Sequence, residues 1–234
     1  MRAFEFDRHV LENYARFSRS FSTPRSPDLD DAIRRQYTEG RFWPDALLSL
    51  NPRYEAGPTT DDLVNSGVLA AETAQVFRID STPVRFHAHQ GQAIAKARAG
   101  QSFVVTTGTG SGKSLCFFVP IVDAIIRARK AGQSPRTRAI IVYPMNALAN
   151  SQIKEIDKFI NQSGLPQNLR PSVKRYTGQE SQEERQRIAA NPPDILLTNF
   201  MMAELLLTRQ DAVDSQVMEN AKGLEFIVLA ELHT

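Results

Sequence analysis

Residues 106–114 read TTGTGSGKS and combine the residue types that hold a nucleotide phosphate. Lys113 can neutralise the β- and γ-phosphates, and the hydroxyl of Ser114 can ligate magnesium. Close approach of the backbone to phosphate oxygens is allowed by three glycines, Gly108, Gly110 and Gly112. The stretch departs from the usual pattern G-x-x-x-x-G-K-S/T, because Thr107 occupies the place of the first glycine. The sequence therefore predicts a phosphate-binding loop of a less common kind.

Such a loop must join a strand to the N-terminus of a helix, and its flanks fit this requirement. From residue 101 onward, runs rich in Val, Ile and Leu alternate with helical stretches, which indicates βαβ units around a buried parallel sheet. In the helix that follows the loop, Pro120 predicts a kink rather than a break. We expect strands at 102–107, 138–144, 173–178, 194–199 and 225–231, and helices at 114–131, 147–162, 181–190 and 200–208.

Composition limits the class of protein. A chain of 234 residues with 41% hydrophobic residues can bury a full core, as one α/β domain with an extension. The longest apolar run, residues 115–126, is too short to span a membrane, and the N-terminus shows no secretory signal, so we expect a cytoplasmic protein. The single cysteine, Cys116, excludes an internal disulfide framework and a cysteine zinc site.

The first 80 residues differ from the rest in pattern and in charge. They hold 10 Lys and Arg against 13 Asp and Glu, whereas residues 81–234 hold 18 against 13. The basic part contains the phosphate-binding loop and suits polyanionic ligands, although an ordinary solvated surface explains the charge equally well. We expect a helical N-terminal extension, residues 1–80, before a nucleotide-binding domain, residues 81–234. In the extension, helices are expected at 6–21, 28–37 and 59–77, with an interruption at Gly67 and an apolar anchor of Phe42, Trp43 and Leu47.

The loop and five further motifs resemble those of superfamily two DExH/DEAD-box helicases, and they occur in the same order. Residues 107–114 match that family's form of the loop, A/T-x-x-G-x-G-K-S/T. The other stretches are FHAHQGQAI (86–94) for the glutamine motif, YPMNALANSQ (143–152) for motif Ia, YTG (176–178) and LLTN (196–199) for motifs Ib and Ic, and LAELHT (229–234) for motif II. The resemblance covers residues 86–234. It implies an α/β, RecA-like P-loop domain with a parallel sheet that binds ATP and Mg²⁺ and acts on nucleic acid.

The resemblance assigns nucleotide contacts residue by residue. Gln90, beside His89, is expected to read adenine, because a glutamine amide can donate and accept at the N6/N7 edge; a surface position at a helix start is the alternative. Lys113 and Glu231 are expected to be catalytic, with Glu231 as the general base, and Mg²⁺ is expected at Ser114 and Glu231. The remaining loop contacts to ATP are Thr107, Gly108, Thr109, Gly110, Ser111 and Gly112.

Four polar residues at expected strand ends are candidates for contacts to a nucleic-acid strand: Asn146, Thr177, Thr198 and Asn199. Ligands bind a parallel sheet at this edge. Short hydroxyl and amide groups there can bond phosphate oxygens without reading the base sequence. Turn capping is the alternative role for each of them. The neighbouring Met201 and Met202 are expected in the core.

Motif II departs from its family at Ala230, where the family has an acid that orients magnesium through its water shell. Glu231 can still polarise water, but the metal lacks that carboxylate. An engineered Asp→Ala change, which the other intact motifs favour, and a naturally silent ATPase both stay open. The chain ends at Thr234, before motif III and the second motor domain of such helicases, so we expect a fragment or the front of a longer chain that binds ATP at best.

Residues 48–69 and the stretch VLAELHT resemble large bacterial helicases related to Lhr, a branch with helicase subunits of anti-phage defence systems of the DISARM and Druantia kind. This placement favours DNA over RNA as the track and allows a partner subunit of a defence complex, while no membrane partner is expected. The function expected is that of an ATP-dependent helicase or translocase. The alternative is a nucleotide-binding assembly module that holds ATP without hydrolysing it.

Overall fold

The computed structural model describes residues 3–21, 24–38, 54–108 and 110–231. The chain divides into two compact units, Met1–Arg53 and Tyr54–Thr234. The first unit contains α1 (Ala3–Ser20) and α2 (Pro27–Thr38), which confirms the two helices expected there. The expected apolar anchor of Phe42, Trp43 and Leu47 lies outside the described residues.

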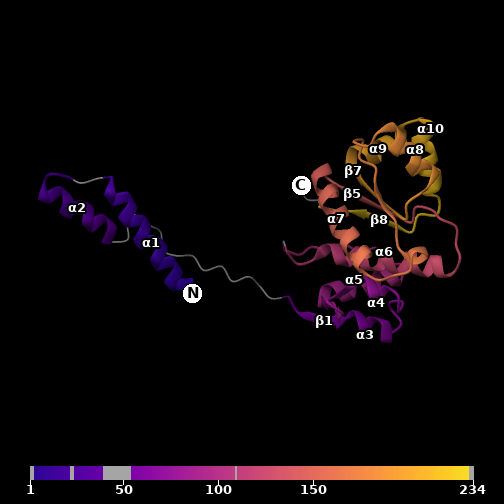
Figure 1. The fold of residues 1–234 in the computed structure, drawn as a ribbon, viewed down its shortest axis with the longest axis horizontal. Coiled ribbons are helices and arrows are strands. Elements are labelled where there is room, and N and C mark those ends of the chain that lie inside the picture. Colours follow the sequence, from indigo (N-terminus) through magenta and orange to yellow (C-terminus); the bar gives the residue numbers. More distant parts are fainter. Residues whose placement is uncertain (1–2, 22–23, 39–53, 109, 232–234) are drawn as a thin grey trace. The chain divides into compact units, whose positions relative to one another are not determined.

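A four-stranded parallel sheet forms the centre of the second unit (Figure 1). Its strands are β5 (Ala139–Tyr143), β6 (Val173–Arg175), β7 (Ile195–Asn199) and β8 (Phe226–Leu229), in the order β6-β7-β5-β8. All three pairings are parallel, with Tyr143 opposite Asn199 and Val142 opposite Leu229. The predicted α/β architecture with a parallel sheet is therefore confirmed.

Helices cover both faces of this sheet. Alternate residues of β5 enter two different cores: Ile141 and Tyr143 join one, Ile140 and Val142 the other. The first core includes α6 (Lys113–Lys130) and α7 (Asn146–Gln162), and the second includes α8 (Gln182–Ala190), α9 (Phe200–Thr208) and α10 (Ala212–Asn220). The helix α6 continues through the buried Pro120, so the predicted absence of a break is confirmed. The sequence reading missed α10. No helix among the described residues is long and apolar enough to cross a membrane.

The prediction of a strand at 102–107 was wrong. These residues lie in neither a helix nor a strand, and the side chain of Val104 is 82% exposed. A strand forms only where a neighbour takes up its backbone N–H and C=O groups. Among the described residues, the sheet ends at β8, which pairs with β5 alone. An apolar β-rich sequence was therefore not sufficient to place these residues in the sheet.

Residues 54–87 belong to the second compact unit. They form β1 (Ala56–Thr59), α3 (Thr60–Asn65), α4 (Thr73–Val76), β2 (Arg78–Ile79), β3 (Thr82–Pro83) and β4 (Arg85–His87), followed by α5 (Ala88–Arg98). The buried carboxylate of Asp123 in α6 fixes them, since it accepts from Ala70 N at 2.6 Å and from Thr73 Oγ1 at 2.7 Å. The division into compact units thus falls before the boundary expected near residue 80. The helical element expected at 59–77, with an interruption at Gly67, forms the two short helices α3 and α4, and Gly67 (φ 76°) lies between them, so the interruption is confirmed.

Candidate nucleotide and nucleic-acid sites

The phosphate loop folds around the side chain of Lys113. Its ammonium donates to the carbonyls of Thr107 at 2.9 Å and Gly108 at 3.4 Å. The hydroxyls of Thr107 and Ser111 lie 2.6 Å apart and form a hydrogen bond across the loop. Gly112 precedes the first residue of α6 in a left-handed conformation, φ 69°, that favours glycine. The threonine in the first-glycine position thus contributes a hydroxyl that a glycine lacks; Thr109 lies outside the described residues.

Gln90 holds the loop through hydrogen bonds to its backbone. The side chain, 2% exposed, donates from Nε2 to the carbonyls of Ser111 at 3.2 Å and Gly112 at 2.8 Å. Its Oε1 accepts from the backbone of His87 at 2.8 Å. Gln90 is therefore buried beside the loop rather than exposed at the surface, with one acceptor lone pair left over. Reading of adenine by this residue stays a prediction.

Three aromatic side chains, His87, His89 and Tyr54, cluster next to the segment that contains Gln90; the sequence placed His89 beside Gln90 but predicted no site role for His87 and Tyr54. The rings of His87 and His89 lie 5.6 Å apart and nearly parallel, and the ring of Tyr54 lies 5.3 Å from His87 and 5.4 Å from His89. A Cβ added to Gly108 would lie 3.1 Å from the Tyr54 hydroxyl, so Tyr54 also borders the phosphate loop. The spacing F-H-A-H-Q was a signal for the two histidines, but no local pattern connects them with Tyr54.

The end of β8 lies beside the end of β5, where motif II meets motif Ia. The backbone N–H of Ala230 donates to the carbonyl of Val142 at 2.9 Å, and Ala230 packs against the same core as Tyr143. The Tyr143 hydroxyl is buried without a hydrogen-bond partner among the described residues. Burial raises the pKa of this phenol well above its usual value, and the charge of Glu231 raises it further. Glu231 itself has a positive φ of 55°.

The residues present fit a magnesium ion that is bound together with a nucleotide. Magnesium is commonly held by one or two carboxylates together with substrate phosphates and water. Here Ser114 offers a hydroxyl and Glu231 a carboxylate, while Ala230 offers no ligand. Among the described residues, no three His, Cys, Asp or Glu side chains gather as a metal site.

The helix α7 connects the phosphate loop with the carboxyl edge of the sheet, the edge at which the parallel strands end. The hydroxyl of Ser114 at the start of α6 donates to Gln152 Oε1 in α7 at 3.3 Å. The first residue of α7 is Asn146. Ser114, a candidate magnesium ligand, is thus hydrogen-bonded to the helix that begins at Asn146, a candidate strand-binding residue.

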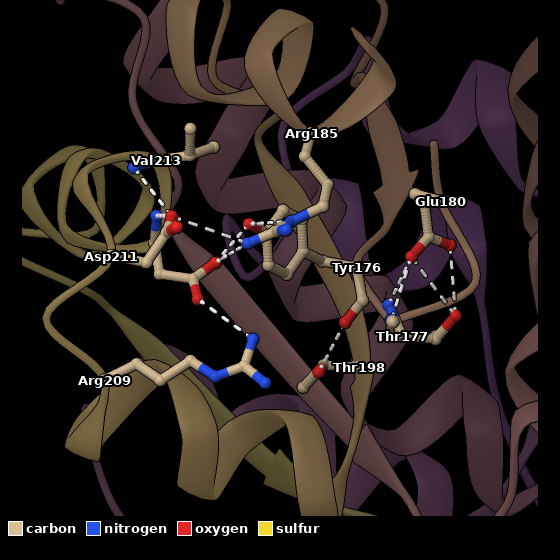
Figure 2. Close-up of polar contacts among 10 residues, drawn as sticks. Tyr176, Thr177, Glu180, Arg185, Thr198, Arg209, Asp211 and Val213 are labelled. Carbon is tan, nitrogen blue, oxygen red and sulfur yellow. Dashed lines mark hydrogen bonds and ion pairs between the residues drawn. The ribbon is translucent and has the colours of Figure 1, made fainter. Parts of the chain in front are cut away.

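The four candidate strand-binding residues come together at this carboxyl edge. The Asn199 amide donates to Asn146 Oδ1 and, at 3.0 Å, to the carbonyl of Thr177. Thr198 is fully buried and donates its only hydroxyl proton to the Tyr176 carbonyl at 2.7 Å (Figure 2). This geometry gives Thr198 a positioning role, and its contact with a phosphate stays a prediction.

A buried charged network connects the segment 176–178 to α8 and α10, which cover one face of the sheet (Figure 2). The Tyr176 hydroxyl donates to Asp214 Oδ1, and Arg185 donates to both, at 3.0 Å to the hydroxyl and 2.7 Å to the carboxylate. Burial, followed by the hydrogen bond to Asp214, raises the pKa of Tyr176 to about 12. The network thus fixes the end of β6 against α8 and α10.

Apolar side chains also border this edge. Met145, Phe200 and Met201 are 59%, 40% and 68% exposed, respectively. The expectation that Met202 is in the core is confirmed, since it is 3% exposed, whereas the same expectation for Met201 was wrong. Successive residues of a helix point about 100° apart, so only one of the adjacent methionines faces the sheet.

Comparison with known proteins agrees with this geometry. Residues 87–234, more than half of the chain, match the DEAD/DEAH box helicase family. The chain belongs to the DEAD/DEAH box helicases. Its fold resembles that of the DUF1998 helicase MrfA bound to DNA and AMPPNP, with a TM-score of 0.57 and 23% identity over 77% of this chain and 22% of that one.

Relatives of this helicase-family chain include three bacterial proteins. It is 30% identical over 150 residues to the ATP-dependent helicase YprA of Bacillus subtilis, which covers 63% of this chain and 18% of YprA. It is 28% identical over 157 residues to the Lhr helicase/uracil glycosylase of Escherichia coli, covering 62% and 10%, and 36% identical over 133 residues to the Druantia protein DruE of Escherichia coli, covering 53% and 7%. These relatives support placement in the Lhr-related branch. The chain spans less than a fifth of the length of each of the three.

Proposed function

We propose that this chain is the ATP-binding and strand-binding part of an ATP-dependent DNA helicase or translocase. The phosphate loop, with Lys113 and Ser114, binds ATP together with Mg²⁺, and Gln90 reads the adenine. The carboxyl edge of the sheet, with Asn146, Thr177, Thr198 and Asn199, follows the backbone of one nucleic-acid strand. DNA as the track is supported by the structural neighbour MrfA, whose structure is bound to DNA, and a defence complex by the relative DruE.

The observation that carries this proposal is the contact of Ser114 with Gln152. A motor needs its nucleotide site and its track to influence each other, and coupling of two sites is a reciprocal free energy. Helix α7 begins at Asn146 on the strand side and meets the loop through Gln152 six residues later. ATP bound at the loop therefore changes the affinity for a strand.

The test measures single-stranded DNA affinity with and without AMPPNP and Mg²⁺. We expect the nucleotide to change the dissociation constant by about fivefold or more, within the usual range of coupling between sites. Gln152→Ala should abolish most of this dependence while it leaves the affinity for each ligand alone nearly unchanged. Gln162→Ala, at the far end of α7, serves as the matched control. An identical DNA affinity with and without nucleotide in the unmodified protein would contradict the proposal.

A second function is favoured by Ala230, namely an assembly module that binds ATP without hydrolysing it. The two functions can be distinguished by comparing the rate of ATP turnover of the full-length protein that carries Ala230 with that of its Ala230→Asp variant. A turnover at least ~100-fold faster with aspartate supports the motor, since effects of this size follow from one preorganised electrostatic element. Equal inactivity of both forms, with ATP still bound, supports the assembly module.

A further inference from the structure

The backbone turn at the candidate strand contact Thr177 already holds an anion, the carboxylate of Glu180 (Figure 2). The backbone N–H of Thr177 donates to Glu180 Oε2 at 2.7 Å, and that of Gly178 donates to the same oxygen at 3.1 Å. The Thr177 hydroxyl donates to Glu180 Oε1 at 3.0 Å. We call these three donors the Thr177 nest.

The nest has the properties of a phosphate-binding turn. Successive backbone N–H groups with a positive φ, here 85° at Gly178, form a concavity that suits an anion. The guanidinium of Arg175 adds a positive charge 3.8 Å from Glu180 Oε1, and it is anchored to Asn150 of α7. Arginine beside backbone donors is the usual setting for a phosphate.

The donors cannot serve two anions at once. A threonine hydroxyl has a single proton and a backbone amide has one, and a phosphate at this edge can only accept them. While Glu180 occupies the nest, neither Thr177 nor Gly178 can donate its hydrogen bond to a strand. Gly178 and Gln179 are exposed, so a phosphate can reach the turn from solvent, whereas the Glu180 side chain is only 4% exposed.

We propose that Glu180 is an internal competitor for the strand phosphate at the Thr177 nest, and that a strand engages Thr177 by displacing this carboxylate. The inference rests on the proposed function, because it takes the carboxyl edge as the track. It adds that one strand contact is an exchange of anions, in which the Thr177 nest releases the Glu180 carboxylate and binds a phosphate of the strand. Glu180 therefore lowers the affinity for the track.

The test is the affinity for a fluorescein-labelled 20-nucleotide oligo-dT as a function of salt. Glu180→Gln preserves the shape of the side chain but removes its charge and one acceptor oxygen. We expect it to tighten binding about tenfold, the effect of one charge-assisted hydrogen bond. The matched control is Glu183→Gln in α8, where the carboxylate is 83% exposed, because it removes the same charge without touching the nest. Equal gains for both variants, or weaker binding by Glu180→Gln, would overturn the proposal.

A second substitution separates competition from simple support of the turn. Thr177→Val should weaken oligo-dT binding much less while Glu180 is present than in the Glu180→Gln background, because with Glu180 present the lost phosphate contact is offset by a lost hydrogen bond to the competing carboxylate. If Thr177→Val weakens binding equally in both backgrounds, Thr177 already contacts the strand and Glu180 does not compete. Retention of the fold in each variant is checked by thermal melting.

A measurement on the unmodified protein covers the case in which Glu180→Gln does not fold. The amide resonances of Thr177 and Gly178 should shift when oligo-dT is added, since both N–H groups change their acceptor. Binding of oligo-dT that leaves these two resonances in place would overturn the inference while the proposed function stands. If neither the unmodified chain nor Glu180→Gln binds oligo-dT, the proposed function fails as well.

Discussion

A methyl group added to Gly112 is expected to destabilise the phosphate loop through two effects, backbone strain at Gly112 and a clash with the side chain of Gln90. Gly112 has φ 69°, and an added Cβ would lie 2.5 Å from Gln90 Nε2. An L-residue in the left-handed region costs roughly 1–2 kcal/mol. The clash forces Gln90 to give up its bonds to the Ser111 and Gly112 carbonyls, at about 1 kcal/mol each. We therefore expect Gly112→Ala to lower the free energy of unfolding by about 3–4 kcal/mol.

The other end of the same helix provides the control. Gly132 also has φ 69°, but an added Cβ there meets nothing within 4 Å. Gly132→Ala should cost only the backbone strain, about 1–2 kcal/mol. Urea unfolding of both variants measures the difference, and an ATP titration should show weaker binding for Gly112→Ala alone.

A double variant tests the role of Gln90 directly. In a Gln90→Ala background the clash is gone, so Gly112→Ala should cost no more than Gly132→Ala does. The two substitutions would then be non-additive by about 2 kcal/mol, as expected for residues in contact. Equal destabilisation by Gly112→Ala and Gly132→Ala in the unmodified background would refute the reasoning.

Three further outcomes are expected. Lys113→Ala should weaken ATP binding about tenfold or more, because a charge-assisted contact to phosphate is lost; unchanged affinity by calorimetry would contradict the loop assignment. Asp214→Ala should lower the free energy of unfolding by about 3–5 kcal/mol, since it leaves Arg185 without its buried partner, whereas the exposed Glu183→Ala should stay within about 0.5 kcal/mol. Burial raises the pKa of Cys116 to about 11, so the thiol should resist iodoacetamide at pH 8, and rapid native-state labelling detected by mass spectrometry would disprove this. Because the pKa of this thiol is higher in the folded state than in the unfolded state, where it is about 8.5, the free energy of unfolding should decrease as the pH rises above that unfolded-state value.

The sequence predicted best those elements whose ends are set locally. The helix expected at 200–208 has those bounds, and Asn199 caps it by accepting from Met202 N. Ser181 likewise caps α8 by accepting from Glu184 N, as the pattern S-x-x-E predicts. Capping depends on residues three positions apart, so it can be read from a short stretch of chain.

The misses depend on contacts between distant residues. The run at 102–107 has strand composition, yet pairing requires a neighbour that composition does not reveal. The helix α10 is short and mostly polar, and only the cap at Asp211 could have indicated its start. The motif at Gln90 was recognised, but its bonds to Ser111 and Gly112 span 21 and 22 residues. Tyr54 reaches the two histidines in the same non-local way.

The candidate site has a consistent physical character: groups expected to meet phosphate are already satisfied by oxygen atoms of the protein. Lys113 donates to loop carbonyls, Ser114 to Gln152 and Thr177 to Glu180. Ligand binding at each point then exchanges one hydrogen bond for another, and the net gain is far smaller than the strength of a bond in isolation. Such exchange keeps the donors positioned and avoids buried unsatisfied groups. It also limits affinity, because each phosphate contact displaces an internal one. Limited affinity suits the helicase or translocase that we propose, which releases nucleotide and track in every cycle.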